Sequence, residues 1–202
     1  MSKIDKSALY KIGYGLYVIT CHDGIKDNGL IVNSVMQVTS TPLAVAVCIS
    51  KKNFSHDVIK NSKTLNVNCL TERAKFSVFE KFGFKSGKEV NKFEGASLPR
   101  TENGLIYLTD CVNSVISLNV TEYIDLGTHG MFICAVSEAR VFNEEESMTY
   151  AYYHKSVKPK PEKKNFSGFV CKICGYFHNS ETLPDDFICP ICKHGASDFE
   201  KL

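Results

Sequence analysis

Four cysteines near the C-terminal end have a spacing suited to metal binding. Cys171 and Cys174 form one pair with two residues between them, and Cys189 and Cys192 form a second pair after fourteen intervening residues. Two such pairs can offer four sulfur ligands to one tetrahedral metal ion. Four sulfurs without histidine favour zinc or iron, and the spacing alone leaves both metals open.

The residues around the cysteines carry a family resemblance. Gly175 follows the first pair and can take the positive φ that turns backbone N–H groups toward the sulfurs. Together with the acidic segments 185–187 and 198–202, the paired cysteines resemble a rubredoxin, which holds one iron on four cysteines. A structural zinc ribbon uses the same turns and is the alternative.

A rubredoxin usually carries a core tryptophan, and this chain has none. We therefore expect Phe187, Phe199 and Tyr176 to fill that core.

The metal-binding segment must be positioned by a larger body. Residues 166–202 are too few to fold on a hydrophobic core alone, so the metal must add stability. The preceding segment is rich in lysine and proline and lacks helical or strand periodicity. We predict a body at 1–154, a linker at 155–165 and a metal domain at 166–202.

Charge is unevenly distributed along the chain. The net charge of +2, from 24 basic and 22 acidic residues, argues against a dedicated nucleic-acid binder. Residues 155–164 carry five lysines and one glutamate, whereas residues 165–202 carry three lysines and five acidic side chains. A basic linker beside an acidic metal domain could guide the docking of an electron carrier. A solvated linker is the alternative.

Nothing in the sequence points to export or to a membrane. The first residues lack the apolar stretch of a signal peptide, and the longest apolar run, residues 43–49, is far too short to span a bilayer. We expect a cytoplasmic protein without a membrane partner, in which disulfides are disfavoured.

The body is predicted to be mainly β. Apolar and alternating segments predict strands at residues 16–21, 30–38, 43–49, 64–70, 104–122 and 131–142. Short helices are expected at residues 5–13, 53–61 and 73–82. Many strands with few short helices indicate a barrel rather than a doubly wound sheet. The expected fold is thus a β-barrel followed by a small metal domain.

Four segments of the body, residues 29–42, 50–57, 82–88 and 127–132, carry a second resemblance. They look like the flavin reductase or flavoredoxin family, whose members are FMN-binding split barrels, and the likeness covers about 150 residues. It implies FMN as a cofactor and a homodimer with flavin near the interface. The fusion of both halves in this order resembles the high-molecular-weight rubredoxins of anaerobes.

The residue types agree with a phosphate site. A phosphate needs backbone N–H groups and positive charge, and a helix N-terminus supplies both. Ordinary helix capping is the alternative role. The predicted phosphate contacts lie where a buried strand meets a helix start: Ser50, Lys52, Asn53, Ser55 and His56.

The flavin ring needs hydrogen-bond donors and acceptors along its edge. Strand-end and turn hydrogen bonding is the alternative role of the polar residues predicted here. Residues 83–88 do not form a Walker phosphate loop, because their spacing is wrong. The other predicted FMN contacts are Asn33, Ser34, Val35, Thr39, Ser40, Cys48, Phe82, Gly83, Ser86, Gly87 and Lys88.

His129 is predicted to be catalytic because it could line the site where a nicotinamide reaches the flavin; a structural role is the alternative. In the family that the chain resembles, an aspartate usually precedes this histidine, and here that position is Thr128. The chain has no Gly-x-Gly-x-x-Gly motif, so a nicotinamide would bind only transiently. The five other cysteines lie in apolar stretches and are predicted to be core residues: Cys21, Cys48, Cys69, Cys111 and Cys134.

These features together predict an electron-transfer protein. FMN takes a hydride, whereas the iron takes electrons singly. The resemblance implies NAD(P)H or a separate reductase as donor, and an acceptor such as a flavodiiron oxygen or nitric oxide reductase. The alternative is an NAD(P)H-dependent flavin reductase whose zinc ribbon only folds and docks.

Overall fold

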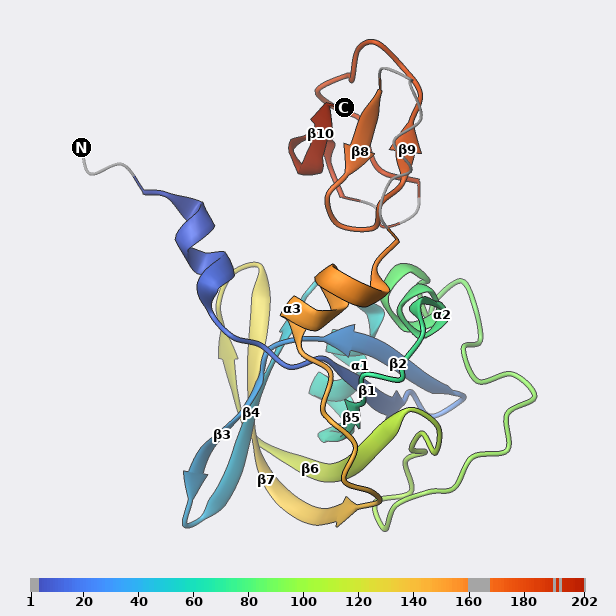
Figure 1. Ribbon diagram of the computed structural model, residues 1–202. Coiled ribbons are helices and arrows are strands. Elements are labelled where there is room, and N and C mark those ends of the chain that lie inside the picture. Colours follow the sequence, from blue (N-terminus) through green and yellow to red (C-terminus); the bar gives the residue numbers. More distant parts are fainter. Residues whose placement is uncertain (1–3, 160–167, 191, 193, 202) are drawn as a thin grey trace.

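The computed structural model describes residues 4–159, 168–190, 192 and 194–201. Seven strands form one antiparallel sheet in the order β2-β1-β5-β6-β7-β4-β3 (Figure 1). Antiparallel strands can be joined by short turns, and three neighbouring pairs, β1 with β2, β3 with β4 and β6 with β7, are consecutive hairpins of this kind. The strands are β1 Tyr17–His22, β2 Asp27–Val32, β3 Val35–Ser40, β4 Leu43–Ser50, β5 Thr64–Leu70, β6 Val112–Asp125 and β7 His129–Val141.

The sheet is rolled, because strands near its two ends bury side chains in the same core. Leu30 of β2 and Val47 of β4 belong to one buried cluster, together with Phe132 of β7. The register of β6 against β7 shifts at Ser117/Leu118 and again at Val120/Glu122. Such bulges bend long strands, and both strands curve in Figure 1. The expected mainly β architecture is confirmed.

Helix α1 (Phe54–Ser62) follows β4 and closes the core. Its buried residue Ile59 packs into the barrel interior. The helix ends at Lys63, whose left-handed backbone lets its N–H donate to the Ile59 carbonyl. This element matches the helix predicted at residues 53–61.

The other helices before the C-terminal module are short. They are the 3₁₀-helix η1 (Lys6–Lys11), α2 (Phe76–Phe79), α3 (Tyr150–Tyr152) and two π-helical turns, η2 (Glu80–Phe84) and η3 (Tyr153–Val157). The rings of Phe79 and Tyr153 are tilted by 40° with their centroids 4.3 Å apart, and both residues share a second core with Val18 of β1. This second core joins residues 76–84 to residues 150–157.

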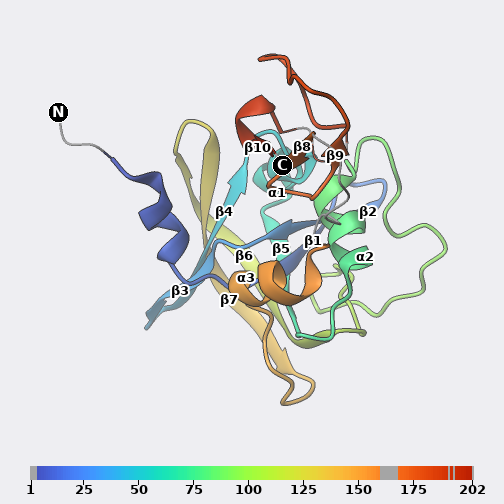
Figure 2. The same ribbon diagram turned by 45° about the horizontal axis from the view of Figure 1, so that its top comes forward.

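The C-terminal module is a small sheet in the order β10-β8-β9. It consists of β8 (Phe169–Cys171), β9 (Phe177–His178), the 3₁₀-helix η4 (Ala196–Asp198) and β10 (Phe199–Lys201). The module lies at the end of the barrel beside α2 and α3 (Figures 1 and 2).

One predicted strand, residues 30–38, is wrong. The structure divides it into β2, which pairs with β1, and β3, which pairs with β4, at opposite ends of the strand order. The chain passes from one end to the other at Asn33 and Ser34. The apolar pattern continues through the crossing, because both strands contribute apolar side chains to the barrel core.

Two other boundaries differ for local reasons. The strand predicted from residue 104 begins only at Val112, because the Asn66 and Asn68 side chains bind backbone groups of Leu105, Ile106 and Leu108 and hold them in a loop. The helix predicted at 73–82 begins at Phe76 and continues as a π-helical turn to Phe84. By contrast, β5 matches the strand predicted at 64–70 residue for residue.

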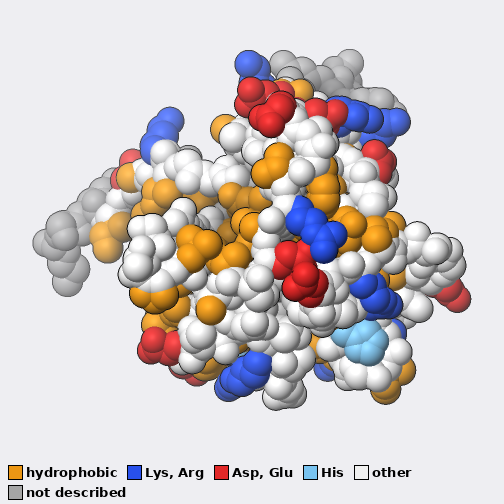
Figure 3. Space-filling model, turned by 90° about the horizontal axis from the view of Figure 1, so that it is seen from below, with side chains coloured by type: hydrophobic (Ala, Val, Ile, Leu, Met, Phe, Trp, Pro, Cys, Tyr) orange, Lys and Arg blue, Asp and Glu red, His pale blue; other side chains and the backbone are white. Residues whose placement is uncertain are grey.

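The β3–β4 hairpin presents apolar side chains to solvent. Met36, Val38 and Leu43 are 60%, 43% and 47% exposed. The face of the molecule seen in Figure 3 carries hydrophobic side chains in a band, and charges of both signs are interspersed on it.

Among the helices in the described part of the chain, none is long and apolar enough to cross a membrane.

Candidate metal centre and flavin site

The first cysteine pair lies in a tight turn that begins where β8 ends. The N–H of Gly175 donates to the Cys171 carbonyl (2.8 Å), and the N–H of Cys171 donates to the Tyr176 carbonyl (2.9 Å). Gly175 has φ +80°, a conformation that a residue with a side chain rarely adopts. In the second turn, the N–H of Cys189 donates to the His194 carbonyl (2.8 Å).

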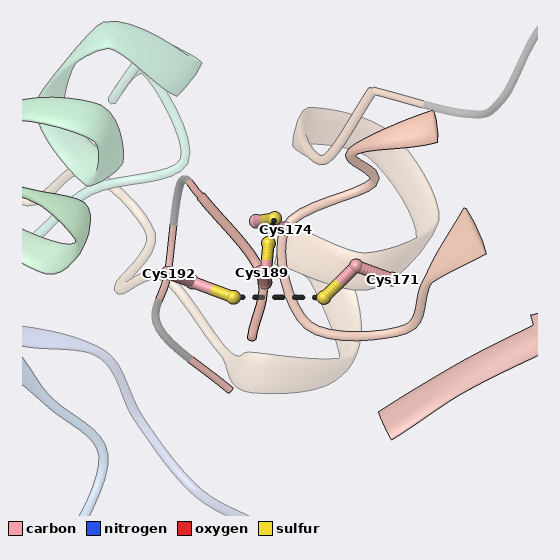
Figure 4. A group of neighbouring side chains, drawn as sticks. All are labelled: Cys171, Cys174, Cys189 and Cys192. Carbon is pink, nitrogen blue, oxygen red and sulfur yellow. Dashed lines mark hydrogen bonds between the residues drawn. The ribbon is translucent and has the colours of Figure 1, made fainter. Parts of the chain in front are cut away.

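These two turns bring the four cysteines together (Figure 4). All four sulfur atoms lie within 4.8 Å of one another. The sulfurs of Cys171 and Cys192 are 3.5 Å apart, as are those of Cys174 and Cys189. Three of the four cysteines are buried and Cys192 is half-buried.

This donor set fits a metal of the predicted kind. Four sulfurs in a compact, mostly buried cluster match the preferences of zinc and of a single iron. Burial raises the pKa of the Cys174 thiol to about 11 and also raises that of Cys192. Metal binding must therefore displace thiol protons at neutral pH.

Aromatic side chains complete the core of the module. Phe187 and Phe199 pack edge to face with ring centroids 5.3 Å apart, and both lie against the cysteine cluster with Tyr176. This confirms the residues expected in place of a core tryptophan. Phe84, at the end of η2, also packs against this cluster, although it belongs to the barrel.

The module is docked on the barrel. A cavity of about 170 Å³ lies between them. The barrel side of this cavity includes Phe84, Tyr153 and His154, and the module side includes Ile173 and Cys192. The half-buried edge of the sulfur cluster thus faces barrel aromatic residues.

Part of the predicted linker is ordered against the barrel. η3 extends to Val157, which packs on the second core. Lys158 has an extended backbone (φ −63°, ψ 127°), as the Lys-Pro repeat predicts. The rest of the predicted linker, from residue 160, lies outside the described residues.

The predicted phosphate residues divide into two groups. Ser50 is half-buried, whereas Lys52 and Asn53 are exposed at the start of α1. Asn53 occupies the N-cap position, but its side chain makes no capping hydrogen bond. Ordinary capping therefore does not account for this asparagine. Lys51 beside them forms an ion pair with Asp125 at 2.5 Å.

Ser55 and His56 point into the barrel instead. The Ser55 hydroxyl accepts a hydrogen bond from the Asn28 amide (2.7 Å). His56 Nε2 lies 3.2 Å from the Tyr123 hydroxyl and Nδ1 lies 2.7 Å from Asp57. Only the backbone N–H groups of Ser55 and His56, and not their side chains, lie at the start of the helix.

Several predicted flavin contacts meet where β3, β4 and β7 lie side by side. The Cys48 N–H donates to the Ser34 carbonyl (2.9 Å), and Ser50 pairs in register with His129. The structure therefore brings Ser34, Cys48, Ser50 and His129 to one region of the sheet, with Asn33 and Val35 beside Ser34. His129 is exposed, and its Nδ1 lies 2.9 Å from the Thr128 hydroxyl.

Thr39 and Ser40 lie elsewhere within this chain. They pair with Ala44 and Leu43 at the tip of the β3–β4 hairpin. At about 3.3 Å per strand residue, Thr39 is about 17 Å from Ser34 along β3. The structure does not bring these two predicted contacts to the group around Ser50.

The segment 82–88 meets the start of α1 through a buried asparagine. A Cβ added to Gly87 would lie 2.2 Å from Asn28 Oδ1, so the Gly87 backbone packs directly on the amide that binds Ser55. Phe82 is buried in the second core, with Gly83 beside it in η2. Ser86 and Lys88 form a turn in which the Lys88 N–H donates to the Ser86 hydroxyl (3.2 Å).

Two residues that shape this region were not predicted. Asn28 lies between the strands predicted at 16–21 and 30–38, outside any predicted element, yet it is 1% exposed. Lys92 is also buried, and its ammonium donates to the carbonyls of Gly29 (2.7 Å) and Phe82 (3.3 Å). Neither has a sequence pattern that distinguishes it from a surface residue, because only the tertiary fold brings these segments together.

The five other cysteines differ in burial. Cys21 and Cys134 are fully buried, as predicted, and burial raises the pKa of each thiol to about 12. Cys48, Cys69 and Cys111 are half-buried.

Comparisons with known proteins agree with both halves of this structure. Residues 9–160 match the flavin reductase like domain family, and residues 169–200 match the rubredoxin-like domain of rubrerythrin. The fold and the four-cysteine cluster together support FMN and one iron as the cofactors.

Two curated relatives and one solved structure show the extent of the similarity. A high molecular weight rubredoxin of Moorella thermoacetica is 34% identical over 98% of this chain and 100% of its own length. A ferric-chelate reductase (NAD(P)H) of Archaeoglobus fulgidus is 35% identical over 78% of this chain and 93% of its own. The NADH:FAD oxidoreductase of Streptomyces globisporus shares the fold, with a TM-score of 0.65 and 18% identity over 74% of this chain and 92% of that one. The chain therefore belongs to the flavin reductase-like family and carries a rubredoxin-like domain after its barrel.

Proposed function

We propose that this chain is an electron-transfer flavo-rubredoxin. It passes electrons from NAD(P)H, directly or through a separate reductase, to FMN in the barrel and then to iron in the C-terminal module. The final acceptor is a redox protein such as a flavodiiron oxygen or nitric oxide reductase. The proposed domain bounds are a flavin domain at 1–154, a linker at 155–165 and an iron domain at 166–202.

The observation that carries this proposal is the docking of the two halves. The half-buried edge of the sulfur cluster, at Cys192, shares a cavity with Phe84 and Tyr153 of the barrel. A module that served only folding would not need its metal edge turned toward the flavin-binding half. The docked arrangement suits electron transfer within one chain.

The residues of the chain have distinct roles in this proposal. FMN exchanges a hydride and single electrons, and an iron on four cysteines exchanges one electron at a time. Cys171, Cys174, Cys189 and Cys192 hold the iron and leave no open ligand position. The backbone at the start of α1, with Ser50, Lys52 and Asn53, binds the FMN phosphate.

The other predicted flavin contacts divide into direct and supporting roles in this proposal. Asn33, Ser34, Val35 and Cys48 line the ring, and exposed His129 stands next to Ser50 where a nicotinamide could approach. Ser55 and His56 support this region from within the barrel, and the segment 82–88 supports it from outside, where Gly87 packs on Asn28. Thr39 and Ser40, at the hairpin tip, meet flavin only if a second copy of the chain brings it there.

The comparisons support a nicotinamide as the electron donor, and exposed apolar side chains support a homodimer. The similarity to a ferric-chelate reductase (NAD(P)H) supports a nicotinamide as the electron source. The exposed apolar side chains of the β3–β4 hairpin, Met36, Val38 and Leu43, suit a homodimer contact through the barrel. We place the protein in the cytoplasm, where a reduced nicotinamide and a redox acceptor are both available.

Metal analysis combined with an anaerobic titration tests the proposal. The purified protein should contain one iron per chain and show thiolate-to-iron absorption beyond the flavin bands. NADH or NADPH should then bleach both sets of bands, and adding an oxidised flavodiiron protein should restore them. One zinc per chain, with flavin bands alone, would instead identify a flavin reductase with a structural zinc ribbon.

A further inference from the structure

Lys158 connects the barrel to the metal module. Its backbone N–H donates to the Tyr153 carbonyl (2.8 Å), which ties it to the barrel at the end of η3. Its ammonium donates to the carbonyl of Lys172, inside the first cysteine turn. One residue therefore holds the end of the barrel and the metal-binding turn together.

The neighbouring backbone shows that this contact is close-packed. A Cβ added to Gly175 would lie 3.2 Å from the Pro159 carbonyl oxygen. The first cysteine turn thus fits directly against residues 158 and 159. This side of the module is placed by a packed surface as well as by a single hydrogen bond.

The Lys158 ammonium also lies in the field of the sulfur cluster. The side chain is half-buried, and burial lowers its pKa, while negative charge on Cys171, Cys174 and Cys192 acts in the opposite direction. A half-buried cation interacts with nearby charges more strongly than an exposed one, because less water screens the pair.

We propose that Lys158 is a positioning residue for the metal centre, which holds the first cysteine turn against the barrel and favours the reduced state of the iron by its positive charge. The inference rests on the proposed iron site. Reduction of Fe(III) to Fe(II) takes up one electron from the flavin side, forms and breaks no bond, and makes the four-thiolate site one unit more negative. A fixed cation stabilises the more negative state more strongly, so it raises the reduction potential.

Substitutions can separate charge from packing. Lys158→Met removes the charge and keeps a long apolar stem, whereas Lys158→Arg keeps the charge. Lys158→Gln can still donate to the Lys172 carbonyl but is neutral. Lys155→Met is the matched control, because Lys155 is an exposed lysine on the π-helical turn that Lys158 follows.

The measurement is the midpoint potential of the iron in the intact protein, followed anaerobically through the iron–thiolate absorption. Metal analysis first shows that each variant keeps one iron. Lys158→Met and Lys158→Gln should each disfavour reduction about tenfold, which is about 59 mV for a one-electron couple. Lys158→Arg and Lys155→Met should stay near the wild-type potential.

Two results would overturn the inference in different ways. If the wild type holds iron and both neutral variants keep its potential, Lys158 has no such role and the proposed function stands. If the wild type holds zinc and no one-electron metal couple, the proposed function and the role of Lys158 fall together.

Discussion

At the scale of single residues, buried polar side chains organise the region around the start of α1. The Asn28 amide donates to the Ser55 hydroxyl and packs against the backbone of Gly87, and Lys92 joins β2 to η2 through two carbonyls. A buried polar group is costly unless it is hydrogen-bonded, so these contacts fix how the two segments meet. The predicted phosphate and ring contacts rest on this arrangement.

Lys92 should make stability depend on pH. Burial lowers its pKa from 10.5 to about 8 in the folded chain. Between about pH 8 and pH 10.5 the unfolded chain therefore binds more protons, and this residue makes stability rise with pH. Relative to Lys92→Met, the wild-type free energy of unfolding should rise by about 1–3 kcal/mol across this window.

Denaturant unfolding of both proteins at several pH values measures this difference. Other groups that titrate in the same range cancel in the comparison. A constant difference between the two proteins would show that Lys92 titrates alike in both states.

At the scale of elements, the start of α1 is the proposed phosphate site. Asn53→Ala should weaken FMN binding while leaving riboflavin binding nearly unchanged, because only FMN carries the phosphate. A charge-assisted hydrogen bond contributes about 1.5–3 kcal/mol, or roughly ten- to a hundredfold in affinity. Fluorescence titration of flavin-free protein measures both affinities.

Asn61→Ala, an exposed position at the other end of the same helix, is the matched control. It should leave both affinities unchanged. Equal losses of FMN and riboflavin in Asn53→Ala would instead mean that this residue supports the fold of the loop.

The two cysteine turns should depend on their metal. Cys171→Ala removes one of four ligands, and a module of this size lacks the apolar core to fold without the metal. The variant should lose the metal and its protection from hydrogen exchange in residues 168–190, while the barrel keeps FMN. A variant that retained a full equivalent of metal would contradict the four-cysteine site.

The sequence predicts elements well where local pattern and tertiary role agree. The strand at 64–70 alternates apolar and polar residues and is correctly bounded, because it pairs on both sides within the sheet. The strand at 30–38 was wrong because alternation reports burial but does not identify the neighbouring strand. The π-helical turns at Glu80–Phe84 and Tyr153–Val157 follow from packing in the second core, which no local pattern encodes.

The same distinction applies to the candidate site. The four cysteines could be predicted because two short, fixed spacings specify them. Asn28, Lys92 and Lys158 could not, because each acts on residues that are distant in sequence or belong to another domain. Their polar side chains look like surface residues until the fold surrounds them.

At the scale of the whole molecule, the barrel and the metal module form one docked unit. Phe84 reaches the cysteine cluster, Lys158 reaches the first turn, and Cys192 shares a cavity with Tyr153. A shared chain keeps the two redox sites at a high effective concentration. In the proposed function, electrons reach the flavin before the iron, because a nicotinamide could stack on a flavin, whereas an iron enclosed by four sulfurs offers it no open position.

Rapid mixing of the anaerobic protein with NADH or NADPH tests that order most directly. Flavin and iron absorption are followed together in FMN-loaded protein and in the same protein after FMN removal. The loaded protein should lose its flavin bands first and its iron bands second. The FMN-free protein should keep its iron oxidised until FMN is added back. Iron reduction at the same rate with and without FMN would contradict this account.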